Sequence, residues 1–402
     1  MTGEMIKRVN IRGYKSLKEI NNVELRPLNI LIGPNNGGKT NFIDFFRLLS
    51  ECAEGRLEEG FVNRGGFDSI IYANSTDRKI AWETYFLNID ETDSQLSYKV
   101  ELTKRGYSPI VEKEELFKRL TGEEEMSLIT SSSGKVSLRR SGPDIPSVFE
   151  DLQGRIDERM RVAQLKNDQL IIAQISDPFV YPAVFRLSSY LKSWGFYSEF
   201  PTGLDSPLRR AQSLRPGLCV SPSGDNLFSV LNNLRERHEY REYYNEILKT
   251  LRVLFPTLGD FHFPPVAGEG KIALAWEGGE FKREFPSYIL SDGLLKFLCL
   301  TTLLLSPELP PLICIDEPEI GLHPRSIGLI GELLTAAANR TQLIVATHSP
   351  QLIKQLKPED ILTVEKKDGA TELRRLPPEE LGSWLKDFTL DELWLTGVIG
   401  GR

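Results

Sequence analysis

The sequence LNILIGPNNGGKTNF, residues 28–42, decides the fold of this chain and the chemistry it can carry. Residues 33–40 fit the pattern G-x-x-x-x-G-K-[ST], which is typical of a phosphate-binding loop. An apolar run at 30–32 leads into the loop, and apolar residues at helical spacing follow it: Phe42, Ile43, Phe46 and Leu49. This pattern predicts a buried strand, the loop and a helix, which is the setting that the motif requires. We therefore expect a nucleotide site here.

The residue types of the loop suit bound phosphate groups. Backbone N–H groups of the loop and of the following helix N-terminus can surround an anion. Lys39 is expected to reach the β- and γ-phosphates as a catalytic residue, and the Thr40 hydroxyl to hold Mg²⁺. ATP and Mg²⁺ are the predicted cofactors. The predicted nucleotide-binding residues are Gly33, Pro34, Asn35, Asn36, Gly37, Gly38, Lys39, Thr40 and Asn41.

Composition limits the class of protein. The 402 residues are 40% hydrophobic and 26% charged, as in a globular protein that can bury a large core. The net charge of −7 means that any contact with DNA or RNA needs a local cluster of cations. The four cysteines form no C-x-x-C pair, so neither zinc nor a disulfide frame is expected. No apolar run approaches the roughly 18 residues of a membrane span, and no signal peptide is evident. We expect a cytoplasmic protein without a membrane partner.

The N-terminal part of the chain reads as mostly strands. Strands are predicted at 5–11, 23–25, 28–32, 79–88 and 96–104, and a hairpin at 127–130 and 135–140. Residues 60–74 read as a loop, and the charged stretch 112–125 as an exposed segment. Residues 147–174 read as a polar helix, and 178–213 as loop and short strand.

The C-terminal part alternates helices with short apolar strands. Helices are predicted at 226–237, 239–255, 293–305 and 324–339, and strands at 261–264, 271–276, 281–285, 312–315 and 342–346. Short Ile, Val and Leu runs separated by helices indicate parallel strands. The predicted fold is α/β, a nucleotide domain with a mixed sheet, interrupted by a mainly helical insertion. Its predicted parts are an N-terminal lobe at 1–105, an inserted region at 106–258 and a C-terminal lobe at 259–402.

Polar residues follow two of the buried strands. Asp316 and Glu317 come after the run 312–315, at the strand end where open α/β sheets bind ligands. Asp316 suits Mg²⁺, and Glu317 suits polarising the water that attacks a γ-phosphate. His348 follows the run 343–346 and can donate to a γ-phosphate oxygen, although a histidine hydrogen-bonded at a strand end is the simpler interpretation of this residue alone.

A fourth segment resembles a second anion-binding helix start. Leu290, Ser291, Asp292 and Gly293 precede an apolar-periodic helix, with Ser291 in the position of an N-cap. Because serine is a routine N-cap, this segment by itself is weak evidence for a ligand.

Together the four segments resemble the ATP-binding cassette (ABC) ATPases. Their order gives Walker A at 33–40, the signature at 290–293, Walker B at 312–317 and the switch histidine at His348. The signature reads LSDG rather than LSGGQ, and Asn36 replaces the usual glycine. Within the family the chain is similar to the branch of SMC, RecF and the OLD nucleases. The segments IKRVNIRGYKSL (6–17), EPEIGLHP (317–324) and LWLTG (393–397) carry this likeness, and the first implies that Lys15 and Ser16 lie near the nucleotide.

The resemblance implies a function and partners. Two chains would pair head to tail, with each ATP between the phosphate loop of one copy and the signature of the other, acting in trans. The chain would be an ATPase in which Glu317, His348 and Lys39 are catalytic. Residues 349–402 leave no room for the Toprim nuclease domain of OLD proteins, and long heptad arms are missing. We therefore expect a separately encoded, nuclease-like effector.

Two functions stay open at this point. In one, the dimer drives or gates a nucleic-acid-directed process such as DNA repair or phage defence. In the other, it is a nucleotide-gated scaffold or sensor for a protein, with slow hydrolysis and no nucleic-acid contact. An exposed strip of cations would favour the first, and the candidates are Arg209, Arg210, Arg215 and the basic helix at 155–166.

Overall fold

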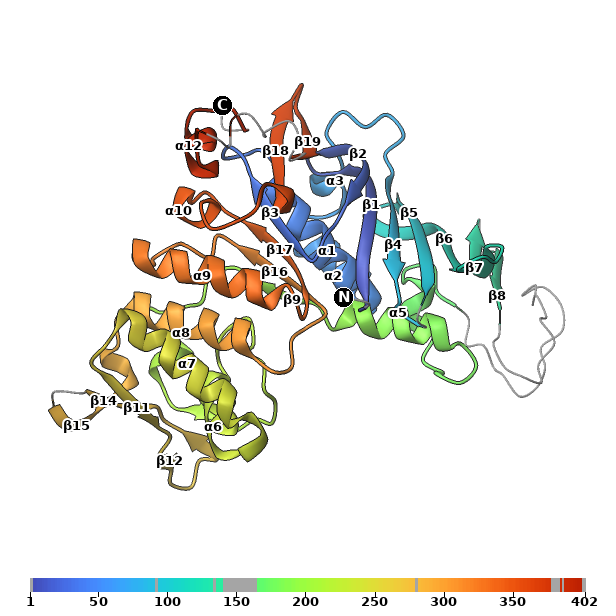
Figure 1. Cartoon of the computed structure of the whole chain (residues 1–402). Helices are drawn as coiled ribbons and strands as arrows, with labels where there is room; N and C mark the ends of the chain where they lie inside the picture. The colour runs from blue at the N-terminus through green and yellow to red at the C-terminus, as the bar shows by residue number, and fades with distance from the viewer. Residues whose placement is uncertain are drawn as a thin grey trace. The chain divides into compact units, whose positions relative to one another are not determined.

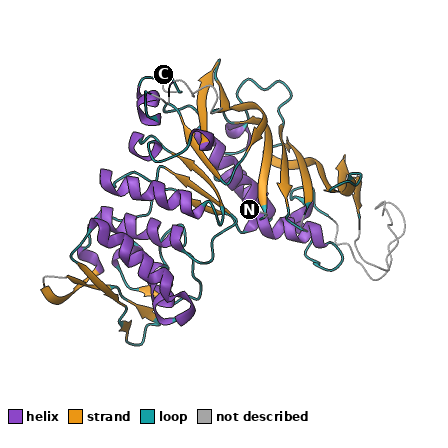
Figure 2. Ribbon diagram, in the orientation of Figure 1, coloured by secondary structure: helices purple, strands orange, loops and turns teal. Residues whose placement is uncertain are grey.

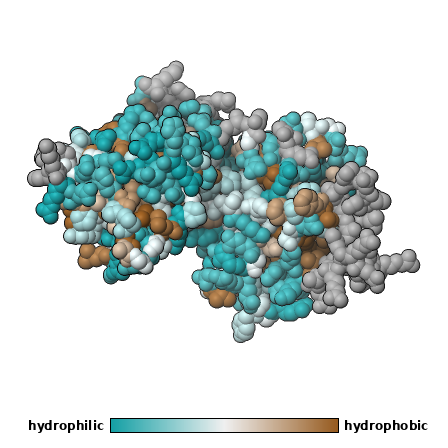
Figure 3. All heavy atoms as spheres, turned by 90° about the horizontal axis from the view of Figure 1, so that it is seen from below, coloured by the Kyte–Doolittle hydropathy of each residue, from teal (hydrophilic) through white to brown (hydrophobic). Residues whose placement is uncertain are grey.

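The computed structural model describes residues 3–90, 93–132, 135–139, 165–278, 281–376, 384 and 387–399. The chain forms two compact units, which are treated separately below. Unit 1 comprises Met1–Trp194 with Leu362–Arg375, and unit 2 comprises Gly195–Ile361 with Leu376–Gly401. Among the described residues, no helix is long and apolar enough to cross a membrane. Figure 3 shows a mainly hydrophilic surface on the face in view, with smaller hydrophobic patches.

Unit 1 contains an antiparallel sheet in the order β2-β1-β4-β5-β6-β7-β8 (Figures 1 and 2). Apolar and polar residues alternate along its strands, so one face is buried and the other is polar. The buried face packs on helix α1, where the Phe45 ring meets the rings of Tyr14 and Trp82 edge to face. The strands are β1 (Met5–Tyr14), β2 (Leu17–Glu24), β4 (Ile80–Leu87), β5 (Ser94–Arg105), β6 (Ser108–Leu120), β7 (Met126–Ser132) and β8 (Lys135–Leu138).

The same unit holds the strand that leads into the phosphate loop. Strand β3 (Leu28–Ile32) is buried along its whole length and lies beside β18 (Ile361–Lys367), which pairs with β19 (Ala370–Arg375). A hairpin from the end of the chain is therefore next to a strand from its beginning. The helices of the unit are α1 (Lys39–Ala53), α2 (Leu57–Val62), α3 (Phe67–Ile70), α4 (Ile171–Gln174) and α5 (Pro182–Lys192).

Unit 2 is built on three parallel strands, with β16 between β9 and β17. They are β9 (Gly195–Tyr197), β16 (Leu312–Asp316) and β17 (Gln342–Ala346). The main helices are α6 (Leu227–Glu236), α7 (Arg241–Leu254), α8 (Asp292–Leu305) and α9 (Pro324–Ala337), with the short α10 (Pro350–Ile353) and α12 (Leu390–Leu395). One small sheet joins β11 (Leu258–His262), β14 (Ala275–Gly278) and β15 (Phe281–Pro286), and another joins β10 (Gln212–Ser213), β13 (Lys271–Ile272) and β12 (Pro265–Val266). Four 3₁₀ turns complete the described elements: η1 (Pro207–Arg209), η2 (His238–Tyr240), η3 (Ser287–Ile289) and η4 (Pro358–Asp360).

The α/β class and most of the predicted strands and helices are confirmed, but three stretches differ from expectation. The predicted loop at 60–74 contains the end of α2 and all of α3, a single turn that begins after Gly66 with φ +88°. The predicted exposed stretch 112–125 is mostly strand β6, and its Glu114 is fully buried. The predicted loop at 178–213 contains helix α5, which begins at Pro182. The predicted helix at 147–174 falls largely outside the described residues.

The boundaries predicted between the two lobes and the inserted region do not coincide with those of the two units. Residue 105 is the end of β5, and β5 and β6 form one continuous hairpin, so a cut at 105/106 would pass through the sheet of unit 1. Strand β9, in the predicted insertion, pairs with β16 from the predicted C-terminal lobe. The described part of 106–258 therefore supplies strands to the sheets of both units, in addition to helices.

Candidate functional site

The phosphate loop of unit 1 has a backbone shape that only glycine allows at two positions. Gly33 has φ +157° and Gly38 has φ +114°. A Cβ atom on Gly33 would overlap the carbonyl oxygen of Val364, and one on Gly38 would overlap the Thr371 hydroxyl. Both obstacles belong to the β18–β19 hairpin. The loop is therefore pressed against this hairpin, and its shape depends on it.

Lys39 and the start of α1 are arranged to receive an anion. Lys39 is only 4% exposed, and its Nζ donates to the carbonyl oxygens of Gly33 (2.9 Å) and Pro34 (3.1 Å). No side chain caps the N-terminus of α1, and its first turn has no acidic residue. The first N–H groups of a helix lack partners within the helix, so they attract negative charge. Thr40, at the second helical position, is exposed.

Two further predicted residues, Ser16 and Asn41, contact each other beside the loop. The Asn41 side-chain amide donates to Ser16 Oγ (2.8 Å). Thr371 of β19 joins them: its Oγ1 lies 2.7 Å from both Ser16 Oγ and the Gly37 carbonyl oxygen, and its N–H donates to the Ser16 carbonyl (2.8 Å). Thr371 is 2% exposed. Sequence reasoning missed it, since a threonine in a strand carries no signal of its own.

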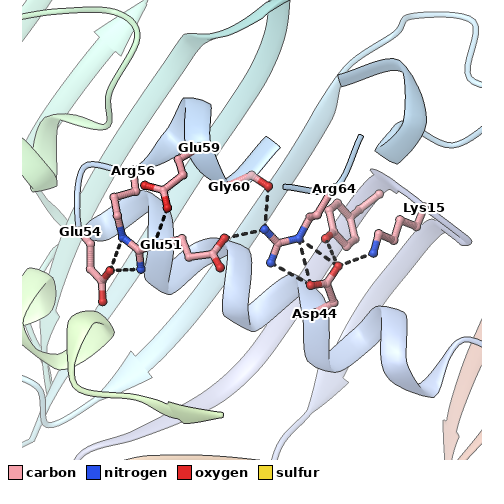
Figure 4. A network of polar contacts seen from close by, with 9 residues as sticks. Lys15, Asp44, Glu51, Glu54, Arg56, Glu59, Gly60 and Arg64 are labelled. Carbon is pink, nitrogen blue, oxygen red and sulfur yellow. Dashed lines mark hydrogen bonds and ion pairs between the residues drawn. The ribbon is translucent and has the colours of Figure 1, made fainter. Parts of the chain in front are cut away.

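Lys15 takes part in a different network (Figure 4). Its Nζ forms an ion pair with Asp44 of α1, which also accepts from the Tyr14 hydroxyl (2.7 Å) and Arg64 Nε (3.0 Å). Arg64 Nη1 reaches Glu51 at 2.5 Å. Burial raises the pKa of Asp44, but the bonds from Arg64 and Lys15 outweigh it and the net pKa is below the usual value. The structure thus places the Lys15 side chain against Asp44 of α1, and its predicted contact with nucleotide stays a prediction.

In unit 2, the predicted Glu317 and His348 lie together. His348 Nε2 is 3.6 Å from Glu317 Oε1, and both side chains are partly exposed, at 28% and 38%. Glu317 has φ +52°, and its N–H donates to the Ala346 carbonyl (2.9 Å), so the chain turns sharply after β16. Asp316, the last residue of β16, is half-buried. Two strand ends therefore present a carboxylate and an imidazole at one edge.

Glu319 is a residue of this edge that sequence reasoning did not single out. Its Oε1 accepts from the Thr347 hydroxyl (2.7 Å) and from the backbone N–H of His348 (2.7 Å). The carboxylate therefore fixes the backbone at His348. Its place within the segment 317–324 is the signal that could have identified it.

The predicted signature segment is held by Arg209. Ser291 caps α8, with its Oγ accepting from the Leu294 N–H (3.3 Å). Arg209 Nη1 donates to the carbonyls of Tyr288 (2.7 Å) and Leu290 (2.8 Å), and the guanidinium pairs with Asp292. Arg209, a candidate for an exposed strip of cations, is therefore not exposed, since its side chain is only 9% accessible.

The other two arginines of that strip also have acidic partners. Arg210 pairs with Asp205, and Arg215 pairs with Asp225 at 2.8 Å. Most of the basic helix at 155–166 falls outside the described residues. Along the signature itself, Leu290 is buried, Gly293 is half-buried, and Ser291 and Asp292 are exposed.

Comparison with known proteins identifies the family. A family model described as "AAA domain, putative AbiEii toxin, Type IV TA system" matches residues 28–354, which run from β3 to the end of α10. The chain belongs to this AAA-domain family. Among curated proteins, none gives a significant match to this AAA-domain chain.

Solved structures agree with this assignment at the level of the fold. One is an SMC head bound to the C-terminal winged-helix domain of ScpA, with TM-score 0.54 and 12% identity over 93% of this chain and 99% of that one. A second, derived from Pyrococcus furiosus, is an SMC head with an extended coiled coil bound to the C-terminal domain of ScpA. It has TM-score 0.53 and 12% identity over 96% of this chain and 99% of that one. The predicted SMC- and ABC-like P-loop ATPase fold is confirmed.

The residues of the AAA-domain chain fit the nucleotide and metal that this fold implies. The uncapped α1 N-terminus and the buried Lys39 offer positive charge to phosphate groups. Bound Mg²⁺ would supply positive charge against the γ-phosphate, and in unit 1 the exposed Thr40 hydroxyl is an oxygen suited to it. The predicted role of Asp316 in unit 2 as a second Mg²⁺ ligand stays a prediction.

Proposed function

We propose that this chain binds and hydrolyses ATP with Mg²⁺, and that two copies pair head to tail around the nucleotide. The observation that carries the proposal is the Glu317–His348 pair, 3.6 Å apart at the end of β16. A carboxylate that only stabilised the end of a strand would not require an imidazole next to it. A carboxylate that accepts a proton from water, next to an imidazole that can donate to phosphate, suits hydrolysis.

The predicted site residues would have different roles in the reaction. Lys39 and the N–H groups at the start of α1 would bind and orient the phosphates. Glu317 would accept the proton of the attacking water, and His348 would donate a hydrogen bond to the γ-phosphate. The exposed Ser291 and Asp292 leave the signature free to meet the nucleotide of a second copy, as the family resemblance implies.

The biological role that we propose is a nucleic-acid-directed process, DNA repair or phage defence, carried out through a separate effector in the cytoplasm. The family description names a type IV toxin–antitoxin system, which supports a two-component arrangement. Both SMC heads in the comparison are bound to ScpA, which supports a protein partner in general.

A nucleotide-gated scaffold that recognises a protein is the second candidate. The pairing of Arg209, Arg210 and Arg215 with carboxylates favours it, because these cations are not free for phosphate. It predicts ATP-dependent dimerisation without any binding of nucleic acid.

Steady-state ATPase assays on three proteins test the hydrolysis proposal. The wild type should release phosphate, Lys39→Ala should lose ATP binding, and Glu317→Gln should bind ATP but turn over about 10²–10⁴-fold more slowly. The exposed Glu246→Gln of α7 is a matched control that should behave as wild type. Unchanged turnover in Glu317→Gln would remove Glu317 from the reaction.

A further inference from the structure

The polar face of the antiparallel sheet in unit 1 contains a hollow of about 510 Å³ with an excess of positive charge. It is lined by three cations, Lys7, Arg8 and Arg119, and by a single carboxylate, that of Glu24. The cations come from β1 and β6, and Tyr85 of β4 lies between them.

Three other cations of this sheet have acidic partners. Lys99 pairs with Glu83 at 3.0 Å, Lys113 pairs with Glu115 at 2.9 Å, and Arg12 pairs with Asp77. Within the described part of the chain, none of Lys7, Arg8 and Arg119 makes an ion pair. Three cations without an acidic partner therefore lie close together in this hollow, although the sheet has carboxylates close by.

Two β-bulges shape the hollow. Between Ile6 and Arg8 the register of β1 on β4 shifts, which leaves Lys7 as an extra residue. A regular strand would send Lys7 and Arg8 to opposite faces, and the bulge allows both to line the same hollow. A second shift between β1 and β2 accompanies Asn22, another lining residue, which has φ +54°.

The Arg8 side chain has a fixed position, but one of its hydrogen-bond donors has no acceptor within the described structure. Its guanidinium carbon lies 4.0 Å from the centre of the Tyr85 ring, a cation–π contact that fixes the side chain. Its Nε is buried and has no hydrogen-bond partner within the described structure. A buried donor on a charged group costs free energy when left unpaired, so the position favours an acceptor from outside.

We propose that this hollow is a phosphate-binding site, taking phosphate groups of a nucleic acid strand or of a free phosphate compound. Guanidinium groups bind phosphate oxygens through two parallel hydrogen bonds, and the neighbouring ammonium adds charge without a fixed direction. The site is distinct from the phosphate loop and deepens the nucleic-acid part of the proposed function, on which its biological role rests.

The test uses the full chain in a Lys39→Ala background, so that the phosphate loop does not contribute. Fluorescence anisotropy measures binding of a labelled 20-nucleotide single strand and of its duplex over a range of salt concentrations. Calorimetry measures binding of pyrophosphate, which separates the free-phosphate source from nucleic acid. The test variant is Lys7→Glu/Arg119→Glu, and the matched control is Lys113→Glu/Lys249→Glu, which changes the net charge equally.

The site predicts at least tenfold weaker binding in the test variant and unchanged binding in the control. If an oligonucleotide is the ligand, the slope of log K against log salt should fall in magnitude by about 1.4–1.8, since each of the two lost phosphate contacts removes roughly 0.7–0.9. Binding of pyrophosphate alone would support the site and assign it to a free phosphate compound.

Two results would overturn the site. One is that neither probe binds the Lys39→Ala protein, and the other is that the test and control variants weaken binding equally. If the charge reversals lower the Tm, Lys7→Gln/Arg119→Gln gives the same comparison. Because none of these measurements depends on ATP turnover, failure here is distinguishable from failure of the ATPase proposal.

Discussion

The Thr371 side chain links the end of the chain to its phosphate loop. The hydroxyl lies 2.7 Å from the Gly37 carbonyl oxygen and from Ser16 Oγ, in a position that is 2% exposed. Asn41, which follows the loop on α1, contacts the same Ser16 hydroxyl. The conformation of the loop therefore depends on a residue that does not belong to the sequence motif.

Replacing Thr371 by valine should weaken ATP binding about 5- to 10-fold, because one buried hydrogen bond of roughly 1 kcal/mol is lost at the loop. Calorimetric titration of ATP measures the change. Thr371→Ser keeps the hydroxyl and should bind ATP within about twofold of the wild type, which separates the hydrogen bond from lost packing. Equal affinities for the valine and serine variants would show that the hydroxyl has no role.

Glu319 acts through its neighbours. Since its Oε1 accepts from the Thr347 hydroxyl and the His348 N–H, removing the carboxylate should let His348 move away from Glu317. We expect Glu319→Ala to lower the kcat of ATP hydrolysis about tenfold with little change in KM. Glu319→Gln retains an acceptor and should recover most of the rate. A loss seen in KM alone would show that Glu319 affects ATP binding instead.

At the scale of elements, strand β6 buries a carboxylate against the start of α4. Glu114 accepts from the N–H groups of Ile171 (2.6 Å) and Ile172 (3.1 Å) and from the Tyr98 hydroxyl (2.9 Å). Burial raises the pKa of Glu114 to about 7, against these hydrogen bonds, which lower it. The folded state therefore holds a proton at this site more tightly than the unfolded chain does.

The sign of the pH dependence follows from this raised pKa. Between about pH 4.5 and pH 7 the folded protein binds more protons at Glu114 than the unfolded chain, so stability falls as the pH rises, by about 3 kcal/mol in total. Urea unfolding from pH 5 to pH 8 measures this fall. Glu114→Gln does not titrate, so the stability of the wild type relative to this variant should fall by the same amount over this pH range. If the free energies of unfolding of the wild type and of Glu114→Gln change with pH in parallel, Glu114 does not have a raised pKa in the folded protein.

Glu114 also shows where sequence patterns stop being informative. The stretch 112–125 looked like an exposed charged segment, because Glu and Lys dominate it. In the structure its alternation belongs to a strand, and Glu114 is buried because the Ile171 and Ile172 N–H groups happen to meet it. Strands β3, β16 and β17 were predictable, since continuous apolar runs leave no other role for those residues.

The same contrast applies to the candidate site. Lys39, Glu317 and His348 follow buried strands and could be found from the sequence. Thr371 and the partners of Arg209 could not, because their contacts join segments that are distant along the chain. The bulge at Lys7 also leaves no mark in the sequence, since it depends on the register of β1 against β4.

At the scale of the whole molecule, the proposed head-to-tail dimer gives a reason for the contacts of Arg209 with the predicted signature segment. Arg209 binds the carbonyls of Tyr288 and Leu290 and the Asp292 carboxylate, which leaves the α8 N-terminus rigid and its Ser291 exposed. The acidic residue in the first turn of α8, Asp292, is already paired with Arg209, so the exposed helix start can accept a further anion. A nucleotide bound to the phosphate loop of another copy would supply one.

The dimer proposal predicts a mass that depends on ATP. In Glu317→Gln, light scattering after size exclusion should give about twice the 45.5 kDa chain mass with ATP and Mg²⁺, and the single-chain mass without nucleotide. Adding Ser291→Arg places a long cation at the predicted contact and should keep the chain a monomer, while its calorimetric affinity for ATP stays within about twofold. The exposed Lys249→Glu on α7 is the control and should still dimerise. If Ser291→Arg also dimerises with ATP, the two copies meet through another surface, and the signature has no role in trans.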